Sequence, residues 1–173
     1  MSLSRRALLH AGLRVLPAGV GGALSLLAWP RRVEAASKAM DPRWALSEAE
    51  WKHRLSPQAY KVLRQEGTEP PFSSPLNKEK RPGTYRCAGC RLSLFKGEAK
   101  YESGTGWPSF WQPLPGALGT KVDFKLLVPR TEYHCRRCGG HQGHVFKDGP
   151  RPTGLRYCNN GVALVFEAVS PST

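Results

Sequence analysis

The chain has 173 residues, and its 26 Lys and Arg against 13 Asp and Glu give a formal net charge of +13. This length favours a single domain with a real hydrophobic core, burying roughly two-thirds of the unfolded surface. The basic residues are scattered, without a basic helix or an aromatic RNA-binding signature. A solvated basic surface is therefore favoured over a nucleic-acid partner.

The N-terminus has the composition of a targeting segment. Residues 1–35 contain five arginines and a single acid, and a glycine-interrupted apolar run extends from Val15 to Trp29. That run is too short to favour a permanent membrane span. A charged start, an apolar middle and a small-residue end predict a cleavable export signal over residues 1–35, cut near Ala35. One domain over residues 36–173 follows.

The pair Arg5 and Arg6, followed by Ala7-Leu8-Leu9, resembles a twin-arginine signal. The twin-arginine pathway carries folded proteins, which suits a protein that acquires a metal before export. We therefore expect a periplasmic or otherwise exported bacterial protein. A mitochondrial presequence, which is also rich in arginine and poor in acids, and an uncleaved anchor are the alternatives.

Two short helices are predicted near the start of the domain. Ser47 and Glu50 have the spacing of a capping box, which predicts a helix over residues 48–55. Ser56-Pro57 repeats the signal for a helix start, and Gly67 is the expected stop. Packing of these helices against the domain is their expected role.

The remainder of the chain has the pattern of a β protein. The segment over residues 68–82 is expected to be extended and ordered, with Phe72 and Leu76 as anchors. The strand-like stretches after it are GTYRC, LSLF, KYES, TKVDFKLLV, TEYHC, GHVF and LRYCNNGVALVFEA. Short strands with turn-like connections predict a mainly β fold of antiparallel sheets rather than βαβ units.

Four of the five cysteines form two Cys-x-x-Cys pairs, Cys87 with Cys90 and Cys135 with Cys138. Two such pairs supply four thiolates at the spacing of a closed structural zinc site. Disulfides are the main alternative in an exported protein. A second alternative by spacing is a site made of Cys87, Cys90, His141 and His144, which would leave the other pair without a role.

The fifth cysteine, Cys158, stands alone. A period of two along its strand places Arg156, Cys158 and Asn160 on one face. A nearby guanidinium favours the thiolate, which is the nucleophilic form of cysteine. A buried and inert thiol is the competing interpretation, since free cysteine is among the most buried residue types.

Several long motifs together point to one family. GTYRCAGC, YESGTGWPSFW and EYHCRRCGGHQGHVFKDGPRPTGLRYC, with Asn160 two places after the last cysteine, resemble the type B methionine sulfoxide reductases, which reduce the R epimer of methionine sulfoxide. The resemblance extends from about Trp44 to Phe166. It implies two antiparallel sheets with short N-terminal helices and a structural Zn²⁺ held by the four paired cysteines.

The resemblance also implies the roles of single residues. Cys158 would be the nucleophile, and His141, His144 and Asn160 would form the polar part of the catalytic site. Trp107 would pack on the S-methyl group of the substrate, with Arg156 as a second substrate-binding candidate. The thiolate would attack the sulfoxide sulfur while a protonated histidine supplies the proton to the oxygen, leaving a sulfenic acid on Cys158.

Two positions depart from the usual pattern of that family. Thr105 stands where many relatives carry a resolving cysteine, so we expect a thioredoxin-like protein or a small thiol to reduce Cys158 directly. In CNNG, Asn159 and Gly161 replace the usual aliphatic residue and Ser, which changes the local packing. The expected substrates are oxidised proteins or peptides, and we expect a monomer.

Two other classes compete with this interpretation. A zinc-containing nucleic-acid binder would account for the cysteine pairs and the charge, but would leave Cys158 and the histidines unused. It predicts strongly salt-dependent binding. A disulfide oxidoreductase working through Cys87 and Cys90 predicts that activity requires these thiols and that metal is absent.

Overall fold

The computed structural model describes residues 41–170, so the predicted export signal lies outside the described residues. Two α-helices and four 3-10 turns are present in this range: α1 (Glu48–Arg54), α2 (Pro57–Gln65), η1 (Pro42–Trp44), η2 (Pro75–Asn77), η3 (Gly97–Ala99) and η4 (Gly161–Ala163). Within residues 41–170, no helix is both long enough and apolar enough to cross a bilayer.

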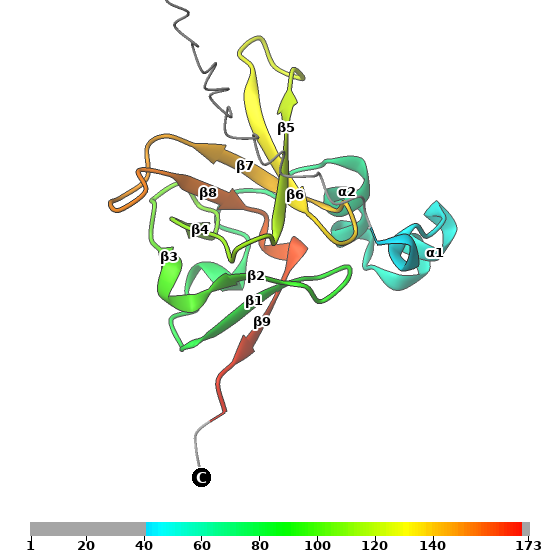
Figure 1. The fold of residues 1–173 in the computed structure, drawn as a ribbon, viewed down its shortest axis with the longest axis horizontal. Helices are drawn as coiled ribbons and strands as arrows, with labels where there is room; N and C mark the ends of the chain where they lie inside the picture. The colour runs from blue at the N-terminus through cyan, green and yellow to red at the C-terminus, as the bar shows by residue number, and fades with distance from the viewer. Residues whose placement is uncertain (1–40, 171–173) are drawn as a thin grey trace, which may run out of the picture. The chain divides into compact units, whose positions relative to one another are not determined.

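Nine strands form two antiparallel sheets in the described part of the chain (Figure 1). The strands are β1 (Gly83–Cys87), β2 (Ser93–Lys96), β3 (Lys100–Tyr101), β4 (Ser109–Phe110), β5 (Leu118–Asp123), β6 (Arg130–Cys135), β7 (His141–Phe146), β8 (Arg156–Asn159) and β9 (Leu164–Ala168). One sheet has the order β2-β1-β9, and the other has the order β3-β4-β8-β7-β6-β5. The prediction of a mainly β fold with two antiparallel sheets and two short helices is confirmed.

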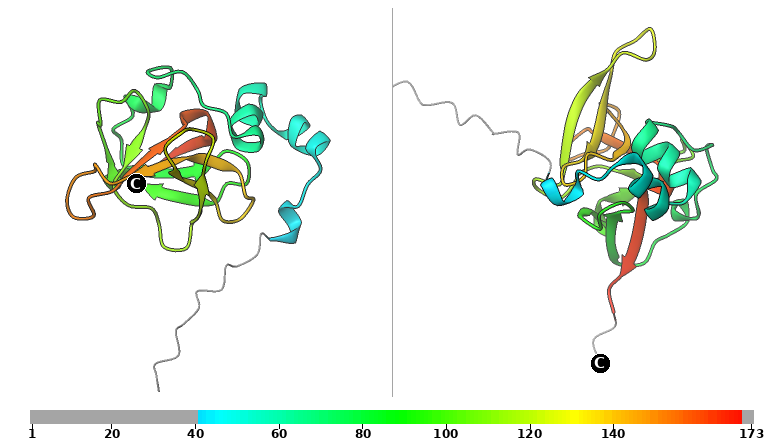
Figure 2. Two further views of the ribbon diagram at one scale, coloured as in Figure 1. Left: turned by 90° about the horizontal axis from the view of Figure 1, so that it is seen from above. Right: turned by 90° about the vertical axis from the view of Figure 1, so that its right-hand side faces the viewer.

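The core lies between the two sheets and is rich in aromatic rings. Phe95 of β2 stacks on Phe110 of β4 with ring centroids 4.1 Å apart, and Tyr85 of β1 meets Phe110 edge-on at 4.9 Å. All three side chains are at most 1% exposed. Offset and edge-on contacts of this kind stabilise a core beyond the burial of area alone. Helix α2 covers β7 and η4 from outside, as the two views in Figure 2 indicate.

Local capping signals explain where the helices begin. Ser47 Oγ accepts a hydrogen bond from the Glu50 amide at 3.3 Å, and the Glu50 carboxylate accepts one from the Ser47 amide at 2.7 Å. This is the predicted capping box. Helix α2 begins at Pro57, as expected. It ends one residue earlier than expected, because Glu66 rather than Gly67 adopts the left-handed conformation, with φ 53°.

Three expectations about the extended segments are corrected by the structure. Phe72 is not an anchor, because its side chain is 73% exposed and only its backbone N–H is held, by Gly106 O at 2.7 Å. The strand expected through Val128 ends at Asp123. The stretch expected as one strand from Leu155 to Ala168 is divided by η4 into β8 and β9, which lie in different sheets.

Candidate active site and metal site

Four cysteines from two turns form one buried cluster. Cys87 ends β1 and Cys90 lies in the turn after it, and Cys135 and Cys138 stand in the same way at the end of β6; all four sulfur atoms lie within 4.8 Å of one another. The shortest contacts join the two turns, at 3.5 Å between Cys90 and Cys135 and 3.7 Å between Cys87 and Cys138. Sulfur ligands of tetrahedral zinc, bound at about 2.3 Å, stand ~3.8 Å apart. The cluster could therefore hold a zinc ion.

The position of this cluster suggests what a metal would do. Strand β1 belongs to the three-stranded sheet and β6 to the six-stranded sheet, so a bound ion would join the two sheets. The alternative with histidine ligands is not the arrangement formed, since His141 and His144 bond to carboxylates instead. The four thiols are at most 2% exposed, which leaves a Cys-x-x-Cys redox centre without access to a partner.

Cys158 lies in a different place, at a small cavity of about 130 Å³. The cavity is lined by Thr68, Trp107, Arg130, Gly143, His144, Phe146, Cys158, Asn159 and Asn160. Four of the predicted site residues thus meet here, namely Cys158, His144, Asn160 and Trp107. His141 and Arg156 do not line it.

His144 is placed by strand register. It is the direct partner of Cys158 in the antiparallel pair formed by β7 and β8. The two strands approach closely one position earlier, where a Cβ on Gly143 would stand 1.9 Å from Cys158 O. Only glycine fits at that position without displacing the backbone. Gly143 therefore allows β7, which carries His144, to pack closely against β8, which carries Cys158.

A carboxylate determines which nitrogen of His144 carries hydrogen. His144 Nε2 lies 2.7 Å from Asp123 Oδ2. The Lys125 backbone N–H, His144 and Arg130 lower the pKa of Asp123 well below its ordinary value, so Asp123 is an ionised acceptor and Nε2 is the donor. Burial lowers the pKa of His144. At neutral pH this leaves a neutral ring whose Nδ1 is free to accept a proton.

His141 is held by a second carboxylate behind the cavity. Its side chain is 3% exposed, and its Nδ1 donates to Glu132 Oε1 at 2.7 Å. Burial alone would raise the pKa of Glu132, but hydrogen bonds from His134 and His141 outweigh it and lower the pKa to about 2. The rings of His141 and His144 meet edge-on at 5.5 Å. His141 Nε2 is buried without a hydrogen-bond partner among the described residues.

The thiol of Cys158 is not activated by its resting environment. Burial raises its pKa, and this outweighs the opposite effects of Arg156 and of the Thr105 hydroxyl. The guanidinium therefore acts in the expected direction without making the thiolate the resting form. The Arg156 guanidinium also has other partners. It donates hydrogen bonds to both carboxylate oxygens of Asp148, at 2.9 and 2.8 Å, and lies over the Phe146 ring.

Glu69, which the sequence did not single out, joins two walls of the cavity. Its backbone oxygen accepts the indole N–H of Trp107 at 3.1 Å, and its backbone N–H donates to Asn160 Oδ1 at 3.0 Å. The Glu69 carboxylate accepts the backbone N–H groups of Gly161 and Val162. Trp107 and Asn160 are thus oriented by one buried residue of the N-terminal segment.

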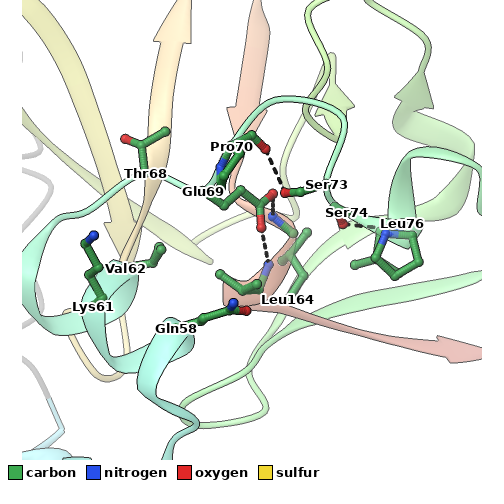
Figure 3. Close-up of a pocket in the computed structure, with 13 residues that line it drawn as sticks. Gln58, Lys61, Val62, Thr68, Glu69, Pro70, Ser73, Ser74, Leu76 and Leu164 are labelled. Atoms are coloured by element: carbon green, nitrogen blue, oxygen red, sulfur yellow. Dashed lines mark hydrogen bonds between the residues drawn. The ribbon is translucent and has the colours of Figure 1, made fainter.

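Figure 3 shows this carboxylate reaching the backbone beyond Asn160, at the edge of a larger cavity of about 620 Å³. That cavity is bounded by α2, the segment over residues 68–76 and the start of β9. No thiol or imidazole lines it, so the reactive groups remain at the smaller cavity. Thr68 and the Glu69 backbone separate the two.

A buried chain of amides explains the unusual Asn159. Its Oδ1 accepts from Tyr133 OH at 2.8 Å, and its Nδ2 donates to Asn160 O at 2.8 Å and to Gln142 Oε1 at 3.4 Å. Gln142 Nε2 in turn donates to Cys87 Sγ at 3.5 Å. Every polar atom of the Asn159 side chain has a hydrogen-bond partner, which allows this polar residue to be fully buried beside Cys158.

The site contains further residues that sequence reasoning missed. Asp123 and Arg130 lie outside the motifs that indicated chemistry, and Glu132 and Phe146 lie inside one of them without being singled out. The strand register sets the neighbours of all four. Charged residues within strand-like stretches, Asp123 in TKVDFKLLV and Glu132 in TEYHC, were the available signal.

The fold and the site define a class: two-sheet β domains that carry a thiol cavity apart from a four-cysteine metal site. Comparison with known sequences makes this specific, because the model of the SelR domain family matches residues 55–168. The chain belongs to this family, that of the type B peptide methionine sulfoxide reductases.

Curated relatives support the assignment over nearly their whole length. A peptide methionine sulfoxide reductase MsrB of Leptospira interrogans is 52% identical over 122 residues, covering 70% of this chain and 93% of the relative. The protein of the same name from Agrobacterium fabrum is 48% identical over 129 residues, with 74% and 96% covered. That from Bradyrhizobium diazoefficiens is 49% identical over 138 residues, with 78% and 97% covered.

Proposed function

We propose that this chain reduces methionine sulfoxide in proteins and peptides back to methionine, with Cys158 as the nucleophile and with specificity for the R epimer. The observation that carries the proposal is the pairing of Cys158 with His144 in one small cavity walled by Trp107. Membership of the family supports the substrate and the epimer. The cavity has a size that fits the end of one methionine side chain.

The resting state dictates how the proton moves. Cys158 is a thiol at rest and His144 is neutral with Nδ1 free, so the imidazole first accepts the thiol proton. The thiolate attacks the sulfoxide sulfur while the imidazolium, stabilised by Asp123, returns the proton to the oxygen. This order differs from the expectation of a histidine that is protonated at the start.

The remaining steps follow from the redox balance. The sulfoxide is reduced by two electrons to methionine, and Cys158 is oxidised to a sulfenic acid that takes up the oxygen. Two equivalents of an external thiol then restore the Cys158 thiol and release water and a disulfide. No thiol of the metal cluster can resolve the sulfenic acid, because all four are buried in a separate site. The reductant is therefore a thioredoxin-like protein or a small thiol.

We also assign Zn²⁺ to the four-cysteine cluster, on the tetrahedral spacing of its buried sulfurs. A zinc ion there would supply structural cross-linking and no redox chemistry. The Gln142 amide, directed at Cys87 Sγ, would stabilise the thiolate charge. Export to the periplasm remains our proposal from the sequence, and N-terminal sequencing of the mature protein tests the cut near Ala35.

Turnover measurements test the proposed reaction. Wild type and Cys158→Ser are compared on the R and S epimers of a methionine sulfoxide peptide, with dithiothreitol as reductant. We expect turnover of the R epimer by wild type alone, and a mass increase of one oxygen on Cys158 when the thiol is omitted. Unchanged R turnover in Cys158→Ser would remove this residue from the mechanism.

A further inference from the structure

The β5–β6 hairpin has an apolar end that nothing covers among the described residues. Of seven large apolar side chains that are exposed within residues 41–170, five lie here: Val122, Phe124, Leu126, Leu127 and Val128. Each is at least 57% exposed. We call these five residues the apolar tip. Figures 1 and 2 show the loop end of the hairpin extending beyond the other strands of the six-stranded sheet. Exposed apolar clusters of this kind mark interaction sites.

The base of the hairpin is part of the active site. Asp123, the last residue of β5, accepts the hydrogen bond from His144. Arg130, the first residue of β6, lines the cavity of Cys158 and forms an ion pair with Asp123 at 2.7 Å. A loop of six residues closed by this pair extends at most about 12 Å beyond it. Three or four extended residues of a bound peptide cover that distance.

The charges on the hairpin disfavour a lipid surface as the occupant. Anionic membranes are recognised by unpaired basic residues near an apolar element. Here Lys121 and Lys125 both form ion pairs with Glu66, and Arg130 is held by Asp123. These ion pairs stabilise the base of the hairpin. Among the described residues of the hairpin, the apolar tip therefore has no cluster of unpaired cations beside it.

We propose that the apolar tip docks the polypeptide that flanks an oxidised methionine, by contact with apolar residues three or four positions away from it. This inference rests on the proposed function. Methionine is mostly buried among apolar residues, and its oxidation to a polar sulfoxide disrupts such packing. The segment that then becomes accessible carries apolar neighbours, which match the exposed side chains beside the cavity.

Two exposed leucines provide the test. In Leu126→Ser/Leu127→Ser the fold is preserved, because both side chains are in solvent. Val169→Ser is the matched control, with a 68% exposed apolar side chain directly after β9, which belongs to the other sheet. Substrates are N-acetyl methionine sulfoxide, a nonapeptide with apolar flanks around the sulfoxide, and the same peptide with Ser and Gly flanks. We expect at least a tenfold fall in kcat/KM, through KM, for the apolar peptide only.

A binding measurement separates this inference from the reaction. Fluorescence anisotropy with the apolar peptide containing unoxidised methionine needs no turnover. We expect a dissociation constant at least tenfold weaker for the double variant and unchanged for the control. Equal affinities, or no binding by wild type, overturn the docking role whatever the activity. Sedimentation with anionic vesicles, or a dimer that the double variant abolishes, would assign the tip to a membrane or to a second copy instead.

Discussion

His144 and Asp123 are joined by a hydrogen bond of 2.7 Å between an imidazole nitrogen and an ionised carboxylate. The bond fixes the ring as the tautomer with hydrogen on Nε2 and leaves Nδ1 to serve the thiol on the neighbouring strand. It also ties the chemistry of β7 to the last residue of β5. In the proposed mechanism, proton transfer at His144 therefore depends on a residue of β5 that lies outside every recognised motif.

Replacing that carboxylate tests the tautomer. In Asp123→Asn the amide can also donate to the ring, which favours the tautomer with hydrogen on Nδ1, so we expect kcat to fall by about 100-fold or more. Asp41→Asn, which removes an exposed carboxylate paired with Arg43, is the control. Steady-state kinetics with circular dichroism distinguish a catalytic loss from a folding defect. Full activity in folded Asp123→Asn contradicts the proposed role of His144.

The reactivity of Cys158 should depend on pH in a defined direction. Because burial raises the pKa of this thiol, the midpoint for alkylation by iodoacetamide lies above that of an ordinary cysteine. Arg156 lowers the pKa, so Arg156→Leu moves the midpoint further upward. Arg86→Leu, in the other sheet, should leave it unchanged. A downward shift in Arg156→Leu would show that the guanidinium does not stabilise the thiolate.

A resolving thiol can be introduced at Thr105. The Thr105 hydroxyl is close enough to Cys158 to influence its pKa, so Thr105→Cys places a second thiol beside the nucleophile. We expect one intramolecular disulfide per turnover when reductant is omitted, detected by mass spectrometry without reduction. Wild type should form none. Thr68→Cys, also at the cavity, is the control for mere proximity. A wild-type disulfide involving Cys158 contradicts recycling by an external thiol.

Loss of the metal site should act on stability more than on chemistry. Cys90→Ser removes one of four ligands that join the two sheets, so we expect bound zinc to fall from about one per chain to near zero. The melting temperature should drop by roughly 10 °C or more, since a loss of several kcal/mol is expected for a structural site. Elemental analysis and calorimetry measure both. Wild-type stability in metal-free Cys90→Ser would show that the cluster is not structural.

Glu132 should contribute to stability in acid. Its pKa is lowered from about 4.5 to about 2 in the folded chain, so the unfolded chain binds the proton first as pH falls. The contribution, on the order of 2 kcal/mol, is present above pH 4.5 and is lost progressively between pH 4.5 and 2. Glu132→Gln should unfold at a lower denaturant concentration at pH 7 and show a shallower decline over that window. Parallel curves for both proteins contradict this contribution.

Local signals in the sequence predicted the helices well, because a capping box is complete within four residues. The end of α2 lies one residue earlier than expected, at a position where Glu66 forms ion pairs with Lys121 and Lys125. Such contacts, between positions more than fifty residues apart, cannot be inferred from composition or periodicity.

The alternating pattern around Cys158 shows the same limit. Period-two alternation continues past Asn160, yet the chain turns there and changes sheets. Glu69, about ninety residues earlier, stabilises this turn by accepting hydrogen bonds from the backbone N–H groups of Gly161 and Val162. The thiol, His144, Asn160 and Trp107 were identified from motifs, whereas Asp123 was not, because only the paired strands bring it to His144.

The position of Glu69 has a consequence for how the activity could be switched off. Glu69 forms hydrogen bonds both to the turn after Cys158 and to the indole of Trp107. It belongs to a segment that is not part of either sheet. A protease cut between α2 and η2 would leave both sheets and all five thiols in place. The indole and the turn would then be held through Glu69 by hydrogen bonds alone, without a continuous chain from α2.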